Sequence, residues 1–327
     1  MLHRRLLRQV LKGDRRAISR AITVLEDDLP GSKELYRELY ARGGHAYVIG
    51  VAGPPGGGKS SLINCMVKEF RSRGNKVGVV AVDPTSPFTG GALLGDRVRM
   101  VDHSLDEGVY IRSMASRGSG GGLSRNTRKA IAALDAARFD YVLLETVGTG
   151  QTEVDVIKMA HVTAVVLMPE TGDSIQAMKA GLMEIADVFV INKADLMGAD
   201  KAAMEISAFL KEKDGWRPPV VMTVAKTCDG VKELVDVLLR YKSHTTGRFV
   251  SGDASRWRAI EEVKDALHER LEREFQEKVK GSEHWAGIIE AVIRRKLDPE
   301  SAAELLMNDE KTAKRIGRSG KRRQEGF

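Results

Sequence analysis

The chain has 327 residues, of which 42% are hydrophobic and 30% are charged, as is usual for globular proteins. No segment approaches the roughly 18 consecutive apolar residues that a membrane-spanning helix requires, and this argues against a membrane protein. The net charge of +7 is concentrated at the two ends, but with 5% aromatic residues and no RNA-binding motif we favour a solvated basic exterior over nucleic-acid binding.

Residues 1 to about 42 carry apolar residues at three- and four-residue spacing, which predicts an N-terminal helical extension ended by Gly43 and Gly44. Its Arg-rich start has the character of a mitochondrial transit peptide, but we favour a basic amphipathic helix that belongs to the mature protein.

From 43 to 250, continuous apolar strands alternate with helices. This alternation predicts an α/β fold with a mostly parallel central sheet and helices on both faces. Strands are expected at 46–52, 77–83, 109–111, 141–145, 162–168, 188–191 and 220–224. Helices are expected at 61–67, 97–101, 123–137, 174–185, 201–213 and 231–241. Segments 84–96 and 113–122, rich in Gly, Ser and other turn residues, are expected to be loops.

Residues 251–327 change to long, charged helices without a strand, at 257–280 and 285–295, with a further helix start near 298 and a basic tail. The predicted organisation is therefore an N-terminal helical extension at 1–42, an α/β domain at 43–250 and a C-terminal helical segment with a basic tail at 251–327.

One stretch matches the phosphate-loop motif G-x-x-x-x-G-K-[ST] at every fixed position, and it lies between a predicted strand and a predicted helix. Its residues are Gly53, Pro54, Pro55, Gly56, Gly57, Gly58, Lys59 and Ser60, and Ser61 continues into the helix. Backbone N–H groups of such a loop and the helix N-terminus bind polyphosphate. Lys59 is expected to reach the β/γ-phosphates and Ser60 to ligate Mg²⁺.

A second motif, Asn-Lys-x-Asp, follows a later strand directly as Asn192, Lys193, Ala194 and Asp195. In GTPases the aspartate of this motif accepts hydrogen bonds from guanine that adenine has no groups to donate, so GTP is favoured over ATP. Ala225, after the last strand, takes the place where a GTPase loop offers its backbone N–H to the guanine oxygen, although Val224 replaces the usual serine.

Two acids end strands predicted to lie near the phosphate loop. Asp83 is expected to hold the hydration shell of Mg²⁺, and Glu145 begins a segment placed like the Asp-x-x-Gly of many GTPases, with the Gly148 N–H near the γ-phosphate. The expected metal residues are thus Ser60, Asp83 and Glu145, with Asp96 a weaker candidate for sensing magnesium or the γ-phosphate.

One departure concerns hydrolysis. In Ras-like proteins a glutamine directly follows Asp-x-x-Gly and orients the attacking water, whereas here Thr149 and Gly150 precede Gln151. We therefore expect slow intrinsic hydrolysis that a partner accelerates.

The only cysteines are Cys65 and Cys228. Because Cys65 lies in the helix after the phosphate loop, we expect no structural disulfide and favour the reducing cytoplasm.

Together these segments resemble the MeaB/ArgK/MMAA family of GTPases associated with methylmalonyl-CoA mutase, in the P-loop class that includes the signal-recognition and metalloenzyme-maturation GTPases. The similarity spans nearly the whole chain. It includes 12–22, 81–87, 89–97, 145–151, 192–195 and 297–303.

The resemblance implies a GTPase chaperone for an adenosylcobalamin-dependent acyl-CoA mutase, which gates cofactor delivery and forms homodimers through C-terminal helices. By matched position it gives Lys59, Asp83, Asp96 and Glu145 roles toward nucleotide, Mg²⁺ and hydrolysis. Segment 172–179 resembles the loop that transmits nucleotide state to the mutase, with Lys179 its most important residue. Gly57, where relatives often carry Val, and the pair at 87–88 depart from the family pattern.

Two alternatives remain. A metal-insertion GTPase should carry clustered Cys and His ligands, and this sequence has two distant cysteines and no His-rich tract. An ATPase or kinase linked to amino-acid (lysine, arginine, ornithine) transport conflicts with the guanine motif at 192–195.

Overall fold

The structure is a computed structural model that describes residues 2–84, 103, 105–116, 122–146, 159–169, 185–212, 214–250 and 253–307. The chain divides into two compact units, Met1–Glu262 and Val263–Phe327. Within the described ranges, no helix is both long and apolar enough to cross a membrane.

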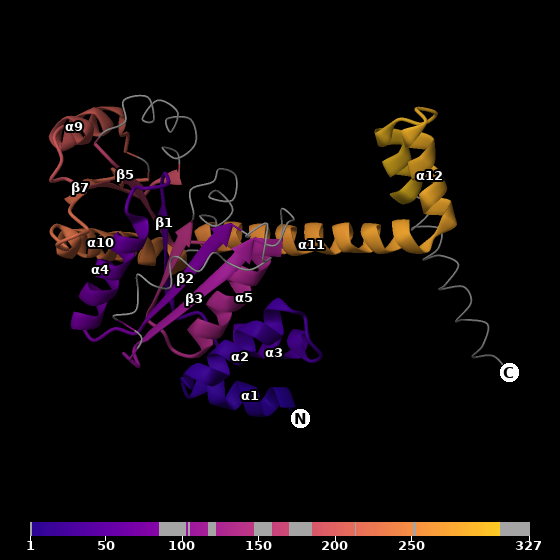
Figure 1. Cartoon of the computed structure of the whole chain (residues 1–327), viewed down its shortest axis with the longest axis horizontal. Helices are drawn as coiled ribbons and strands as arrows, with labels where there is room; N and C mark the ends of the chain where they lie inside the picture. Colours follow the sequence, from indigo (N-terminus) through magenta and orange to yellow (C-terminus); the bar gives the residue numbers. More distant parts are fainter. Residues whose placement is uncertain are drawn as a thin grey trace. The chain divides into compact units, whose positions relative to one another are not determined.

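A seven-stranded sheet forms the centre of the first unit, with the strand order β3-β2-β4-β1-β5-β6-β7 (Figure 1). All neighbouring strands run parallel. The strands are β1 (Tyr47–Ala52), β2 (Val77–Pro84), β3 (Val109–Ser116), β4 (Tyr141–Thr146), β5 (Val162–Leu167), β6 (Val188–Asn192) and β7 (Val220–Thr223). Every residue of β1, β5 and β6 is buried, as expected for a parallel sheet covered on both faces.

Helices cover both faces of the sheet. They are α4 (Lys59–Ser72), α5 (Gly122–Ala136), α9 (Ala199–Phe209) and α10 (Val231–Val250). On β1, Ile49 faces the side where Leu62 of α4 and Leu234 of α10 pack. Val48, the preceding residue, faces the opposite side, which Leu134 of α5 shares. The alternation along the strand therefore places one apolar layer on each face, and the predicted α/β P-loop architecture is confirmed.

Three N-terminal helices pack beside α5 (Figure 1): α1 (Leu2–Leu11), α2 (Arg15–Glu26) and α3 (Ser32–Tyr40). Their buried residues, such as Ile18, Leu25 and Leu35, belong to the same apolar cluster as α5 and the adjacent sheet face. Lys129 of α5 adds polar contacts, because its Nζ donates to the Leu25 carbonyl at 2.6 Å and to Asp28 Oδ1 at 2.9 Å. The predicted helical extension therefore shares a core with the sheet, while its boundary at 42 stays a prediction.

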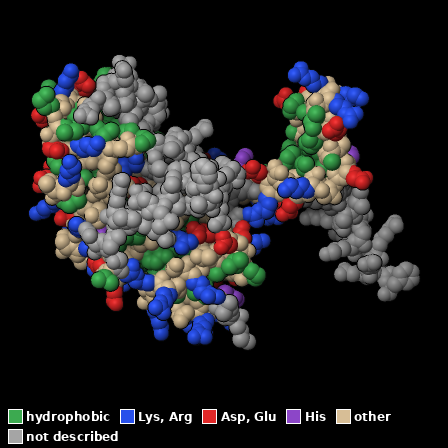
Figure 2. All heavy atoms as spheres, in the orientation of Figure 1, with side chains coloured by type: hydrophobic (Ala, Val, Ile, Leu, Met, Phe, Trp, Pro, Cys, Tyr) green, Lys and Arg blue, Asp and Glu red, His purple; other side chains and the backbone are tan. Residues whose placement is uncertain are grey.

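The N-terminal helix α1 is amphipathic, as the sequence predicted. Leu6, Leu7 and Val10 are buried, whereas the arginines at 4, 5 and 8 are exposed. In Figure 2 blue basic side chains gather over the N-terminal helices.

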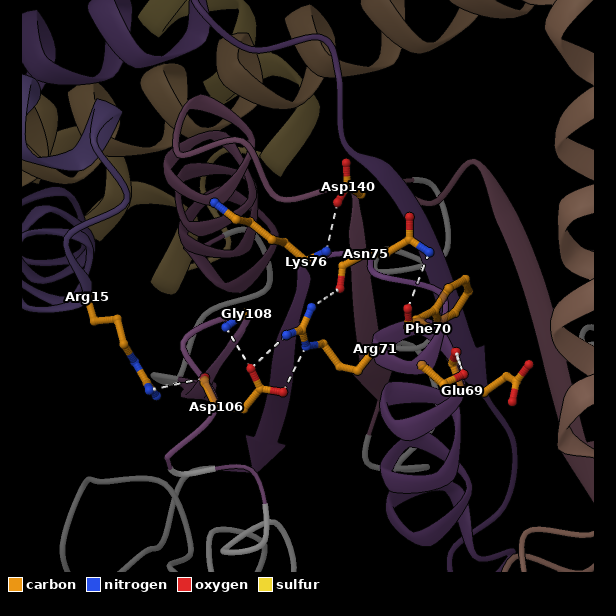
Figure 3. Close-up of polar contacts among 10 residues, drawn as sticks. Arg15, Glu69, Phe70, Arg71, Asn75, Lys76, Asp106, Gly108 and Asp140 are labelled. Atoms are coloured by element: carbon orange, nitrogen blue, oxygen red, sulfur yellow. Dashed lines mark hydrogen bonds and ion pairs between the residues drawn. The ribbon is translucent and has the colours of Figure 1, made fainter.

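The end of α4 remote from the phosphate loop is fixed by an ion pair (Figure 3). Arg71 donates from Nε and Nη2 to the Asp106 carboxylate at 2.8 and 2.9 Å, and from Nη1 to the Asn75 carbonyl at 2.7 Å. Asp106 also accepts from the Gly108 backbone N–H at 2.8 Å. The hydrogen bond from Arg71, assisted by that of Gly108, lowers the pKa of Asp106. Helix α4 is thus held to the segment that leads into β3.

Some predicted boundaries were wrong. β3 continues through Ser116, where a loop was expected from 113, because Ser113–Ser116 pair with Ala81–Pro84 of β2. α10 continues to Val250 rather than ending at 241. The helix expected at 97–101, most of that expected at 174–185, and the loop expected at 84–96 (apart from Pro84) lie outside the described residues.

The second unit is helical over the residues that the structure describes. α11 (Asp253–Gly281) crosses the boundary between the units, and α12 (Glu283–Ile293) and a helix at 299–307 follow. Ser282 caps α12 by accepting from the Trp285 N–H at 3.4 Å. The Trp285 ring packs edge-on against Phe275, with 5.7 Å between centroids. The predicted helices are present, while the boundary at 250/251 stays a prediction.

Candidate functional site

The phosphate-loop sequence lies between the central strand β1 and helix α4. Gly53, Gly56 and Gly58 all have positive φ values, of 139°, 77° and 81°. A Cβ at Gly53 would collide with the Val166 carbonyl of β5, and one at Gly58 with the Asn192 side chain. The loop path therefore requires glycine at these two positions, both for its backbone angles and for the close approach of neighbouring groups.

Lys59 is the first residue of α4, and its side chain turns back over the loop. Its Nζ donates to the carbonyls of Gly53 at 2.7 Å and Pro54 at 3.0 Å. The residue is buried, so the loop holds a desolvated positive charge close to its own backbone N–H groups and to the positive end of the α4 dipole. These features favour an anionic ligand such as a polyphosphate.

Ser60 and Glu145 meet beside the loop. The Ser60 hydroxyl donates to Glu145 Oε1 at 2.6 Å, and both side chains are buried. The sheet register causes this contact, because β4 lies next to β1 and pairs Glu145 with Val51 near the end of that strand. A hydroxyl and a carboxylate are hard oxygen ligands, so the pair fits Mg²⁺, which binds few protein groups and retains waters.

Asp83, the third predicted metal residue, lies in β2, the other neighbour of β4. Ala81 pairs with Glu145, so the backbone of Asp83 is two residues further toward the same sheet edge. The described side chains contain no group of three or more His, Cys, Asp or Glu residues suited to a metal. The structure thus brings two of the three predicted residues together in side-chain contact and describes only the backbone of the third.

Asn192 connects the phosphate loop to the predicted guanine loop. Its Nδ2 donates to the Gly57 carbonyl at 2.8 Å, and its Oδ1 accepts from Thr223 Oγ1 at 3.2 Å and from the Ala225 N–H at 3.1 Å. Asn192 and Thr223 are each only 1% exposed. Asn192 thus fixes two loops that follow different strands, β1 and β7.

The remaining residues of the predicted guanine site follow β6 and β7. Lys193 has a left-handed φ of 58°, which turns the chain sharply after β6. Asp195, two residues further, is exposed to solvent. The Ala225 N–H donates to Asn192 Oδ1 at 3.1 Å, and its role toward guanine stays a prediction. Thr223 was missed by the sequence reasoning, although its place at the end of the strand before Ala225 was a usable signal.

The absence of a disulfide was predicted wrongly. Cys65 of α4 and Cys228 of the loop after β7 form a disulfide with a Cα–Cα distance of 5.4 Å. The two residues are separated by 163 positions in sequence, and the fold brings them together because α4 and α10 pack side by side with the β7–α10 loop at their edge. Neither the helical position of Cys65 nor the expected cytoplasmic location indicated that the two cysteines lie close together.

For four of the predicted site residues the structure describes no side chain. Asp96, Gly148 and Lys179 are outside the described residues, and of Asp83 only the backbone is described. Their roles stay predictions.

A glycine-rich loop between a parallel strand and a helix, its inward-turned lysine and the asparagine tie to a second loop define a P-loop nucleotide-binding protein. The model of one family, described as methylmalonyl-CoA mutase-associated GTPase MeaB, matches residues 18–280. The chain belongs to this family and is a GTPase.

The chain is also similar to individual proteins and to solved structures. A putative GTPase of Pyrococcus abyssi is 46% identical over 93% of this chain and 95% of its own length. The mitochondrial methylmalonic aciduria type A homolog of Caenorhabditis elegans is 34% identical over 93% of this chain and 82% of its own. Among solved structures, one named LAO/AO transport system kinase superposes with a TM-score of 0.70 at 25% identity, covering 94% of this chain and 97% of that one.

Proposed function

We propose that this GTPase is a chaperone of an adenosylcobalamin-dependent acyl-CoA mutase, namely methylmalonyl-CoA mutase, and that its nucleotide state gates loading of the mutase with its cofactor. The observation that carries the proposal is the family match over 18–280, which includes the phosphate loop, the Ser60–Glu145 pair and the guanine motif. The name shared by the mouse and nematode relatives, methylmalonic aciduria type A homolog, supports the same partner.

In the proposed site, GTP binds with its phosphates over Gly53–Ser60 and its base between Asp195 and Ala225. Lys59 would exchange the carbonyls of Gly53 and Pro54 for phosphate oxygens. The Lys59 ammonium would then donate to negatively charged oxygens instead of neutral carbonyls, and a charged acceptor strengthens a hydrogen bond. Asn192 would keep the phosphate and base halves of the site in register through its bonds to Gly57 and Ala225.

Mg²⁺, when bound, would neutralise charge that develops on the phosphate oxygens. Ser60 would hold it through its hydroxyl oxygen and Glu145 through its carboxylate, with Asp83 acting through its hydration shell. Gly148 and Asp96 are proposed to respond to the γ-phosphate, and Lys179 to act in hydrolysis or in signalling to the mutase.

We also propose that the protein forms a homodimer through its C-terminal helices. Within the second unit, α11 carries Val263, Leu267 and Leu271 at four-residue spacing, and these side chains are 67, 55 and 52% exposed. An apolar stripe of this kind favours burial against another helix. A cytoplasmic location is also proposed, with neither membrane nor nucleic acid as a partner.

The kinase alternative is suggested by the name of one structural relative. It predicts preference for ATP, whereas the site residues predict preference for GTP. Binding titrations with the two nucleotides separate these functions. Asp195→Ala should reduce the preference for guanine by more than it reduces affinity for the phosphates, and similar losses for GTP and ATP would contradict the assigned base site.

The partner is tested by capture of methylmalonyl-CoA mutase with the purified protein loaded with GDP or with a non-hydrolysable GTP analogue. We expect capture that depends on the nucleotide, and GTP turnover by the isolated protein that is slow and rises when the mutase is added. Capture in neither nucleotide state would refute the chaperone proposal and leave the GTPase assignment intact.

A further inference from the structure

The disulfide between Cys65 and Cys228 joins two elements of the nucleotide site. Cys65 belongs to α4, the helix that begins with Lys59 and Ser60. Cys228 belongs to the loop that also contains Ala225, the residue assigned to the guanine oxygen. The bond therefore covalently connects the phosphate-binding helix to the base-binding loop, in parallel with the hydrogen bonds made by Asn192.

Besides the disulfide, the hydrogen bond from Ala225 to Asn192 and the packing of Ala225 against the core, the loop at 224–230 has short-range contacts of its own. Val224 and Asp229 form an isolated bridge, and the Thr227 N–H donates to the Val224 carbonyl at 3.1 Å. Thr227 and Asp229 are exposed. Cys228 has a left-handed φ of 66°, a conformation that residues other than Gly, Asn and Asp rarely adopt. The disulfide holds this residue in place from the side of α4.

The two cysteine residues differ in exposure. Cys65 is only 3% exposed, whereas Cys228 is half-buried between its two exposed neighbours. We therefore expect a reducing thiolate to attack from the side of Cys228. The Cys65 sulfur lies 3.3 Å from the Ala225 carbonyl oxygen, so a free Cys65 thiol has an acceptor ready within the site. The reduced Cys65 thiol would therefore keep a hydrogen-bond acceptor inside the site.

We propose that Cys65–Cys228 is a redox modification site that controls how tightly the base-binding loop holds guanine nucleotide. Its co-reactant is a small or protein dithiol. One thiolate attacks the Cys228 sulfur, the S–S bond breaks, and the electron pair goes to the Cys65 sulfur, which takes up a proton. The second thiol of the reductant then attacks the mixed disulfide and releases the Cys228 thiol. The protein gains two thiols, and the reductant leaves as a disulfide.

Oxidation should slow nucleotide release. With the disulfide formed, the loop that contains Ala225 is already fixed against α4, so binding has less chain to order. After reduction the loop gains freedom, and we expect GDP to dissociate about three- to tenfold faster. This inference rests on the proposed placement of guanine beside Ala225 and Asp195.

The test measures release of a fluorescent GDP analogue from the full-length protein after treatment with oxidised glutathione or with dithiothreitol, with free thiols counted in each sample. Cys228→Ser is the matched variant, because its side chain is close in size and its position is partly exposed. We expect no free thiols and slow release after oxidation, two thiols and fast release after reduction, and fast release from Cys228→Ser under both treatments.

Two free thiols after oxidation, or equal release rates from wild-type protein in both states, would overturn the proposal. A redox response that persists in Cys228→Ser would also overturn it, because the effect would then arise elsewhere. Binding of GDP in neither state would overturn the placement of the guanine site, and this proposal with it. Cys65→Ser provides a second variant with the same expected behaviour as Cys228→Ser.

Discussion

Asn192→Ala is the substitution that most directly tests the connection between the two halves of the nucleotide site. The side chain is almost completely buried and makes three hydrogen bonds, to Gly57, Thr223 and Ala225. Each such bond contributes about 1 kcal/mol net, so their loss should lower the free energy of unfolding of the nucleotide-free protein by about 3 kcal/mol. The carbonyl of Gly57 and the hydroxyl of Thr223 would also lose a partner.

The assay is urea unfolding followed by tryptophan fluorescence. Trp216 reports on the first unit, since its indole N–H donates to the Asp187 carbonyl at 2.8 Å. Thr223→Val removes one of the three bonds at similar side-chain volume and should cost about 1 kcal/mol. Thr227→Ser, on the exposed surface of the same loop, keeps the hydroxyl that donates to Asp229 and should change stability by no more than about 0.5 kcal/mol. An Asn192→Ala protein as stable as the Thr227→Ser control would refute the reasoning.

Three further predictions follow from the same structure. Lys59→Ala removes the buried ammonium over the loop and should weaken GDP binding at least about 100-fold in a fluorescence titration, and a loss below threefold would contradict its role. Ser60→Ala and Glu145→Gln should each reduce magnesium-dependent GTP hydrolysis by about 100-fold while GDP still binds in the presence of EDTA, whereas unchanged hydrolysis would remove the pair from the metal site. Asp106→Asn breaks the ion pair with Arg71: because the folded-state pKa of Asp106 is lowered, its carboxylate stabilises the protein above about pH 4 and this contribution is lost as the pH falls further. At pH 7 the variant should therefore be less stable by about 1 kcal/mol after allowance for partial exposure, and so have a lower melting temperature. This difference should shrink as the pH is lowered below about 4, and equal melting temperatures at pH 7 would rule the contribution out.

The local parts of the site could be predicted from sequence because each depends on residues that are neighbours in the chain. Strand β1, the glycines of the loop and Lys59 form one continuous pattern, and Asn192 directly ends a buried strand. The contact of Ser60 with Glu145 was also within reach, because carboxyl ends of parallel strands meet at one edge of a sheet.

Contacts between distant segments were not predictable in the same way. The Cys65–Cys228 bond depends on how α4 lies against the β7–α10 loop, and neither cysteine has a local pattern that indicates its partner. The length of β3 depends on its pairing with β2, whose strand extends to Pro84, and not on the glycine and serine content that suggested a loop. The role of Thr223 depends on its hydrogen bond to the buried side-chain oxygen of Asn192, which the sequence around Thr223 does not indicate.

The shared core of the N-terminal helices with α5 limits how this protein can be shortened. A recombinant fragment that began near residue 43, at the start of the predicted GTPase domain, would leave Ala130, Ala133 and Leu134 of α5 without the apolar side chains that now cover them. It would also leave the buried ammonium of Lys129 without the Leu25 carbonyl and Asp28. Such a fragment should aggregate or bind other surfaces nonspecifically, so nucleotide-binding experiments on it would report on a damaged protein rather than on an isolated domain.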